Sequence, residues 1–143
     1  MAKLIEFEKG LVEYDIGGAL TVRFNPTDEG FIAKIEDTFA SLDGLQERLA
    51  EDGSFSQFGE LDAQMRAKVD GLLGDGAADA LFEGMNCFAI ADGLPVWLNL
   101  MLALMDEVSD ACEREFGRTD ARFGEHKAKY QKMMAKYRAG GGR

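Results

Sequence analysis

The sequence contains little of the residue types that most catalytic and metal sites require. Its 143 residues include two cysteines and a single histidine. Two cysteines exclude a disulfide scaffold. A zinc site needs four Cys or His ligands, or three and a water, and Cys87, Cys112 and His126 make three at irregular spacing. A catalytic Ser-His-Asp or Cys-His arrangement would have to use His126, and nothing in the sequence places a partner beside it. We therefore expect no catalytic residue, no cofactor and no metal, and a protein that is not an enzyme.

Long hydrophobic runs are also missing. The longest apolar stretch, Leu94–Met105, is interrupted by Pro95 and Asn99. It has about a dozen residues, whereas about 20 are needed to cross a bilayer. The first residues, Met1–Phe7, contain no apolar segment of signal-peptide length. The sequence predicts a protein that does not bind membranes and that resides in the cytoplasm.

Positive charge is scarce in most of the chain. The formal net charge is −10. Residues 1–117 carry 24 acidic and 8 basic side chains, whereas residues 118–143 carry 2 acidic and 8 basic ones. The acidic part would repel nucleic acid, because phosphate binding needs clustered Lys and Arg. The basic part can contact an acidic surface, either another protein or the body of its own chain, and the sequence leaves both open.

Strands are predicted near the N-terminus. Three short segments between Lys3 and Phe24 are rich in β-branched and aromatic residues and alternate in part between apolar and charged side chains. Gly10 separates the first two segments, and Gly17-Gly18 is typical of a two-residue hairpin turn. A meander of two or three strands needs an apolar surface to pack on. We expect this β-meander, residues 3–24, to lie on the helices that follow.

Apolar residues at helical spacing come next. Asn25-Pro26-Thr27-Asp28-Glu29 is a helix-start signal with Asn25 or Thr27 as the cap. The stripe behind it predicts a helix of about six turns, and it consists of Phe31, Ile35, Phe39, Leu42, Leu45 and Leu49. A second stripe predicts an antiparallel partner helix, and it consists of Phe58, Leu61, Met65, Val69 and Leu72.

The C-terminal half predicts two more long helices. After a short helix or turn at 77–83 and a loop at 84–93, Pro95 marks the first turn of a helix that runs to about Phe116. The first turns of this helix are apolar on nearly every face, which indicates either a central core helix or a helix that also contacts a partner. Thr119-Asp120 is a cap signal for a last, basic helix. The Gly-rich residues 139–143 are expected to form a flexible tail.

The predicted fold is therefore α+β and mostly α. An N-terminal β-hairpin or meander packs on a bundle of about four helices. Residues 1–117 form an acidic globular body. Residues 118–143 form a basic C-terminal helix that can move, with a Gly-rich tail, and they belong to the same domain.

Two apolar surfaces are candidates for partner binding. The first is the most hydrophobic stretch, with Trp97, Leu98 and Met101, where core packing is the first interpretation and partner contact the second. The second is the edge of the basic helix that carries Phe123, Tyr130, Met134 and Tyr137. Such an edge can fold back on the acidic body or lie in the groove of a neighbour. The sequence leaves these alternatives open.

Several stretches of the chain are similar to one protein family. They are Val22-Arg23-Phe24-Asn25-Pro26-Thr27-Asp28, the segment from Leu73-Gly74-Asp75 to Asn86-Cys87-Phe88, Asp92-Gly93-Leu94-Pro95-Val96-Trp97, and Lys129-Tyr130-Gln131-Lys132-Met133-Met134-Ala135-Lys136-Tyr137. Taken together they resemble the tail assembly chaperones, small acidic proteins encoded in the tail-gene region of long-tailed phages and prophages of Gram-positive bacteria. The features that carry the resemblance are turns, caps and aromatic residues rather than catalytic groups.

The resemblance implies a non-catalytic function. Tail assembly chaperones coat the long helical tape-measure protein, keep it in solution and help to recruit tail tube subunits around it. The implied partners are the phage tape-measure protein and the tail tube protein, and the implied location is the host cytoplasm. Self-association is open, because a swinging C-terminal helix could stack one copy on the next.

Two other functions stay open. The strongly acidic body is typical of inhibitors that imitate DNA, as in phage counter-defence, although the basic C-terminal segment interrupts the negative surface that such mimicry needs. The other is a head–tail connector or tail-completion subunit. A connector would persist in the finished particle, whereas a chaperone would be absent from it.

Overall fold

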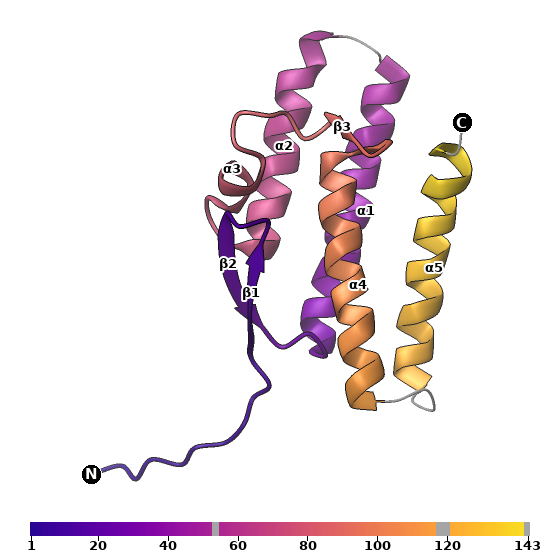
Figure 1. Cartoon of the computed structure of the whole chain (residues 1–143). Coiled ribbons are helices and arrows are strands. Elements are labelled where there is room, and N and C mark those ends of the chain that lie inside the picture. The colour runs from indigo at the N-terminus through magenta and orange to yellow at the C-terminus, as the bar shows by residue number, and fades with distance from the viewer. Residues whose placement is uncertain (53–54, 117–120, 142–143) are drawn as a thin grey trace.

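The structure, a computed structural model, describes residues 1–52, 55–116 and 121–141. In these residues four long helices stand side by side, with a β-hairpin and a short helix along one side of the bundle (Figure 1). In chain order the elements are β1 (Val12–Ile16), β2 (Leu20–Phe24), α1 (Glu29–Asp52), α2 (Phe55–Leu73), α3 (Ala77–Phe82), β3 (Ile90–Ala91), β4 (Leu94–Pro95), α4 (Val96–Phe116) and α5 (Ala121–Gly141). This order confirms the mostly helical α+β fold with an N-terminal hairpin.

The hairpin β1–β2 forms as its sequence predicts. Val12 lies opposite Phe24 in an antiparallel register. Both turn glycines, Gly17 and Gly18, have positive φ angles of 62° and 72°, a conformation that glycine adopts without steric cost. The apolar face of the hairpin meets the bundle where Phe24 stacks on Phe31 of α1, with 4.2 Å between the ring centroids.

The first predicted strand does not form. Residues 1–11 are an extended arm that leads away from the bundle, so the meander predicted over residues 3–24 is a two-stranded hairpin that begins at Val12 (Figure 1). Gly10 has a φ of 67°, which turns the chain at the base of the arm. The Asn25 side-chain amide fixes this turn by donating to the Lys9 carbonyl oxygen at 2.9 Å. The Glu8 carboxylate accepts a hydrogen bond from the Gly10 N–H at 2.8 Å.

Helices α1 and α2 form the antiparallel pair that their apolar stripes predict (Figure 1). Asp28 caps α1 by accepting a hydrogen bond from the Gly30 N–H at 3.0 Å. Asn25, one of the expected caps, instead accepts a hydrogen bond from the Thr27 N–H at 2.8 Å. The two helices share one core, to which they contribute Ile32, Ile35, Phe39, Leu42, Leu45, Leu61, Met65, Val69 and Leu72.

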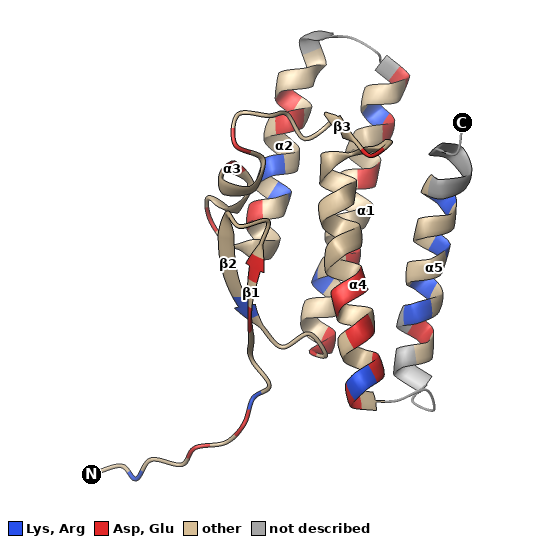
Figure 2. Ribbon diagram, in the orientation of Figure 1, with Lys and Arg blue, Asp and Glu red and all other residues tan. Residues whose placement is uncertain are grey.

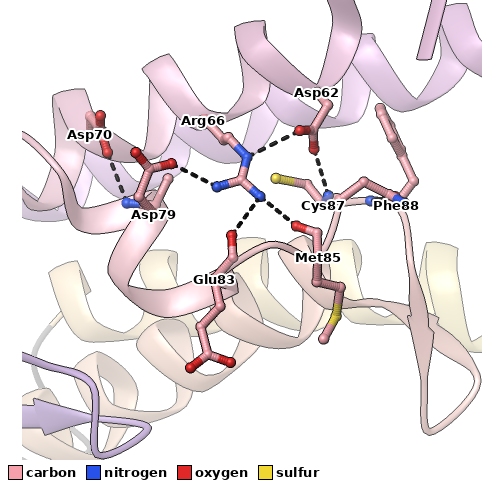
Figure 3. A network of polar contacts seen from close by, with 10 residues as sticks. Asp62, Arg66, Asp70, Asp79, Glu83, Met85, Cys87 and Phe88 are labelled. Atoms are coloured by element: carbon pink, nitrogen blue, oxygen red, sulfur yellow. Dashed lines mark hydrogen bonds and ion pairs between the residues drawn. The ribbon is translucent and has the colours of Figure 1, made fainter. Parts of the chain in front are cut away.

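Arg66 connects α2 to the segment that follows it (Figure 3). Its guanidinium pairs with Asp62 at 3.0 Å and with Asp79 of α3 at 2.7 Å, and it donates to the Met85 carbonyl oxygen. Asp62 also accepts a hydrogen bond from the Cys87 N–H at 2.6 Å. These contacts fasten α3 and the loop after it to α2, so this charged cluster is a structural support.

A short hairpin precedes α4, where the sequence predicts a loop and then a proline in the first helical turn. Ile90 lies opposite Pro95 in the two-residue strands β3 and β4. Asp92 and Gly93 close the hairpin with positive φ angles of 58° and 82°, which an Asp-Gly pair favours. Pro95 therefore ends a strand, and α4 begins one residue later at Val96.

Helix α4 is the central helix of the bundle, as its apolar first turns predict. Trp97, Leu98 and Met101 are fully buried. The Trp97 indole N–H donates to the Gln46 side-chain oxygen of α1 at 2.8 Å, so the one polar atom of this side chain has a partner inside the bundle. In the described part of the chain, no helix is long and apolar enough to cross a bilayer.

Candidate interaction surface

Helix α5 is the outer helix of the bundle and runs antiparallel to α4 (Figure 1). It extends to Gly141, so residues 139–141, expected in a flexible tail, are helical, whereas residues 142–143 lie outside the described residues. Basic side chains follow α5, and acidic side chains are frequent on α1 and α4 (Figure 2). In the single chain, this basic helix packs on its own acidic body.

One edge of α5 packs against the core. Tyr130, Met133, Met134 and Tyr137 lie within two turns on the same side of the helix, and all four are partly buried against the core cluster. The candidate residues Tyr130, Met134 and Tyr137 therefore share one contact surface. The side chain of the fourth candidate of this helix, Phe123, lies outside the described residues.

An aromatic cluster joins three helices at this contact. The Tyr137 ring meets Phe39 of α1 and Trp97 of α4 edge to face, with 6.0 and 6.1 Å between the ring centroids. Phe39 and Trp97 also meet each other at 6.0 Å. Edge-to-face pairs at these distances are favourable beyond their buried area. The structure thus brings two candidate residues, Trp97 and Tyr137, together.

Polar contacts flank the aromatic cluster. The Tyr137 hydroxyl donates to the Asp43 carboxylate of α1. The Lys136 ammonium pairs with the same carboxylate at 2.5 Å and with Glu47 at 3.3 Å, and the Lys129 ammonium pairs with Glu36 at 3.2 Å. Because Glu36, Asp43 and Glu47 are seven and four residues apart, they lie on one face of α1. We call these three residues the acidic stripe, and the surface between α1 and α4 that α5 covers the α5 groove.

The protonation states of these groups favour the contact. Burial raises the pKa of the Tyr137 hydroxyl well above its usual value, and the neighbouring Asp43 carboxylate raises it further. The hydroxyl therefore keeps its proton and donates it to Asp43 at every physiological pH. The hydrogen bond to Asp43 also raises the pKa of Lys136, so this side chain stays charged.

The α5 groove is not filled completely. A cavity of about 40 Å³ lies at the junction of α1, α4 and α5. Its lining includes Ile35, Met105, Val108, Cys112, Tyr130 and Met133. Since an unfilled apolar space deprives its lining of van der Waals contacts, α5 is incompletely packed beside Tyr130 and Met133.

The candidate residues divide into two groups. Trp97, Leu98 and Met101 lie in the core and are covered by the chain itself, so the single chain does not present them to a partner. Tyr130, Met134 and Tyr137 hold α5 in its groove. The sequence reasoning missed the residues that receive α5. The spacing of Glu36, Asp43 and Glu47 on one helical face was the signal that could have found them.

Cys87 is a titratable group outside the α5 groove, and it lies beside Asp62. Burial, together with the nearby Asp62 carboxylate, raises the pKa of Cys87 to about 12. The nucleophilic form of cysteine is the thiolate, so Cys87 stays an unreactive thiol at neutral pH. Among the described side chains, no three His, Cys, Asp or Glu residues are grouped to hold a metal ion. The side chain of His126 lies outside them.

Comparisons of the chain with protein-family models, with curated proteins and with solved structures find no match.

Proposed function

We propose that the protein is a non-catalytic tail assembly chaperone of a long-tailed phage, which works in the host cytoplasm, binds the tape-measure protein and helps to recruit tail tube subunits. The observation that carries this proposal is the docking of α5. The acidic body receives a basic helix in the α5 groove through one aromatic edge and one acidic stripe. The resemblance of the sequence to tail assembly chaperones supports the same function.

A groove that receives α5 can receive a helix of the same character from another protein. Recognition of a helix in a groove uses apolar side chains at positions i, i+3 or i+4, and i+7. Tyr130, Met134 and Tyr137 occupy such positions in α5, and Lys129 and Lys136 flank them. A tape-measure helix with an apolar edge beside Lys or Arg residues would therefore bind in place of α5. Its basic side chains would pair with the acidic stripe.

Helix α5 is held in a way that allows exchange. Because α5 belongs to the same chain, it competes with a partner at a high effective concentration. A partner can therefore replace it only if the contacts that hold α5 are weak. The Lys129 and Lys136 side chains are 59% and 53% exposed, whereas their partners Glu36 and Asp43 are 21% and 19% exposed. Water on the lysine side screens these pairs, and exposed ion pairs contribute about 0–1 kcal/mol each. The cavity beside Tyr130 further limits the packing of α5. A long partner that offers many such helices can therefore displace it.

The alternative functions have less support. A DNA mimic needs an unbroken negative surface, whereas Lys129 and Lys136 lie on the acidic stripe and neutralise part of it. A head–tail connector shares the helical fold with the proposed chaperone. The two differ in whether the protein remains in the particle, and this can be measured directly.

Affinity purification of the tagged full chain from phage-producing cells tests the proposal. We expect mass spectrometry to identify the tape-measure protein and the tail tube protein among the bound proteins. Purified phage particles should lack the chain, whereas a connector would be present in them. Recovery of a nuclease or a DNA-binding protein without phage structural proteins would overturn the proposal and support the DNA mimic.

Neutralising the acidic stripe tests the groove itself. The stripe variant carries Glu36→Gln, Asp43→Asn and Glu47→Gln, and we expect it to recover much less tape-measure protein. A matched control removes three negative charges at exposed positions elsewhere on α1 and α2, by Asp37→Asn, Glu51→Gln and Glu60→Gln. Equal recovery by the stripe variant and the control would show that the partner binds outside the α5 groove.

A further inference from the structure

The N-terminal arm, residues 1–11, exposes apolar side chains that a single chain does not cover. Leu4, Ile5 and Phe7 are 79%, 81% and 74% exposed. Their sequence has the composition and alternation of a β-strand. The arm nevertheless has no strand partner in its own chain, because the described part of the sheet consists of β1 and β2. An apolar segment of this kind is typical of a surface that binds another protein.

The two faces of the extended arm differ in character. Successive side chains of an extended chain point to opposite sides. One face therefore carries two apolar side chains between two basic ones: Lys3, Ile5, Phe7 and Lys9. The opposite face carries the apolar side chain of Leu4 and the carboxylates of Glu6 and Glu8. The first face matches an apolar cleft with acidic groups at its border.

Such a cleft lies between the β1–β2 hairpin and α4. It has a volume of about 230 Å³, and its lining includes the ring of Tyr14 and the apolar side chains of Ile16, Phe24, Leu100, Ala103 and Leu104. Asp15 and Glu107 add two carboxylates to the lining, and the Glu107 carboxylate already accepts a hydrogen bond from the Tyr14 hydroxyl at 2.9 Å and pairs with Arg114 at 3.7 Å. An apolar cavity of roughly 150 Å³ is known to hold a benzene ring, so the cleft has room for the ring of Phe7.

The base of the arm directs it away from this cleft in the same chain. The positive φ of Gly10 and the hydrogen bond from Asn25 to the Lys9 carbonyl oxygen fix the point where the arm leaves the hairpin. From there the arm runs out past the end of the bundle (Figure 1). The cleft of another molecule is therefore the binding site that this geometry favours.

We propose that the arm of one copy binds the cleft between β1 and α4 of a second copy, with Ile5 and Phe7 against its apolar lining. Lys3 and Lys9 then lie near the carboxylates of Asp15 and Glu107, and Glu6 and Glu8 stay in water. Because each copy has one arm and one cleft, a reciprocal exchange closes a two-fold symmetric dimer. The arm and its cleft share no residue with the α5 groove, so the dimer leaves the groove open to its partner.

Variants of the two arm faces test this contact in the full chain. We expect sedimentation equilibrium to show a dimer for the unchanged protein. The double variant Ile5→Ser, Phe7→Ser should weaken the dimer at least about tenfold, because it removes two apolar side chains from each contact. The matched control Leu4→Ser removes one equally exposed apolar side chain from the opposite face and should remain dimeric. A monomer at millimolar concentration for the unchanged protein, or equal weakening by Leu4→Ser, would overturn the proposal.

A second pair of variants tests the cleft. Ala103 is exposed and lines the cleft, whereas Ala67 is exposed on α2 and does not line it. Ala103→Glu places a charge in the path of Phe7 and should abolish the dimer, and the control Ala67→Glu should retain it. A dimer that survives Ala103→Glu unchanged would show that the arm binds elsewhere.

Oxidation of introduced cysteines to a disulfide distinguishes binding of the arm to a second copy from folding of the arm onto its own cleft. The native Cys87 and Cys112 are fully buried, so new exposed cysteines react first. A mixture of Phe7→Cys chains with Ala103→Cys chains should form a mixed disulfide between two molecules under mild oxidation. An internal disulfide in a monomer of the chain that carries both substitutions would show that the arm folds back on its own cleft and would overturn the proposal.

Discussion

The hydroxyl of Tyr137 on α5 donates its hydrogen to the carboxylate of Asp43 on α1, a residue 94 positions earlier in the chain. Asp43 also pairs with Lys136, and the Tyr137 ring contacts Trp97 and Phe39. One side chain thus combines the polar and the apolar parts of the contact that holds the basic helix. The strength of this contact determines how readily the α5 groove becomes available.

Replacing Tyr137 by Phe should loosen α5 without disturbing the core. The variant keeps the ring that packs on Trp97 and loses the hydrogen bond to Asp43, which should reduce the stability of α5 docking by about 1–3 kcal/mol. Amide hydrogen exchange resolved by helix measures this as faster exchange in α5 and unchanged exchange in α2. The control is Tyr130→Phe, because the Tyr130–Asp106 contact is exposed and should contribute less. Equal effects of the two variants would contradict a special role of Tyr137.

Fluorescence of Trp97 should report whether the α5 groove is covered, by α5 or by a peptide that replaces it. Trp97 is the single tryptophan of the chain, is fully buried and lies beside Tyr137. Removal of residues 118–143 uncovers the side of Trp97 that Tyr137 covers, so its emission should move to longer wavelength. Titration with a peptide that binds in place of α5 should leave the emission at short wavelength, because the peptide covers the same side. A red shift on peptide binding would show that the peptide displaces α5 without occupying its groove.

Much of this fold follows from local patterns in the sequence. The stripes through Ile35 and Leu61 place the core faces of α1 and α2 where the structure has them. Gly17 and Gly18 mark the turn of the first hairpin because few other residues adopt positive φ angles readily. The second hairpin, which ends at Pro95, has two-residue strands that are too short to show any periodicity.

The candidate site depends on contacts between distant residues, which local patterns do not contain. An apolar run such as Trp97–Met101 predicts burial but does not tell whether another helix of the chain or a partner covers it. The structure shows that α5 covers part of it through Tyr137. The strand expected at Leu4–Glu8 has the right composition, but composition does not state whether its partner strand lies in the same molecule.

The thiol of Cys87 should resist modification in the folded protein. Its pKa, raised to about 12 by burial and by Asp62, leaves almost no thiolate at pH 8. Ellman's reagent should therefore detect no reaction of Cys87 or of the buried Cys112 under native conditions, and both should react in urea. Rapid reaction of one thiol per native chain would contradict the buried position of these residues.

The stability of the fold should fall in acid through Asp62. Burial by itself would raise the pKa of this carboxyl, but the Cys87 N–H and the Arg66 guanidinium outweigh it and hold the pKa below its usual value. The unfolded carboxyl titrates near 3.9, so the folded state binds its proton only at lower pH. Asp62 therefore adds stability above about pH 4 and loses this contribution as the pH falls through its folded pKa.

The variant Asp62→Asn isolates this effect, because its amide does not titrate and still offers an oxygen to the Cys87 N–H. Urea unfolding should give a difference in free energy between the natural protein and the variant that is constant from about pH 5 to 7. This difference should shrink below about pH 4, where the unfolded carboxylate becomes protonated. The control Asp75→Asn, at an exposed acidic residue, should show no such change. A difference that grows on acidification would mean that the pKa of Asp62 is raised and that Arg66 does not stabilise its charge.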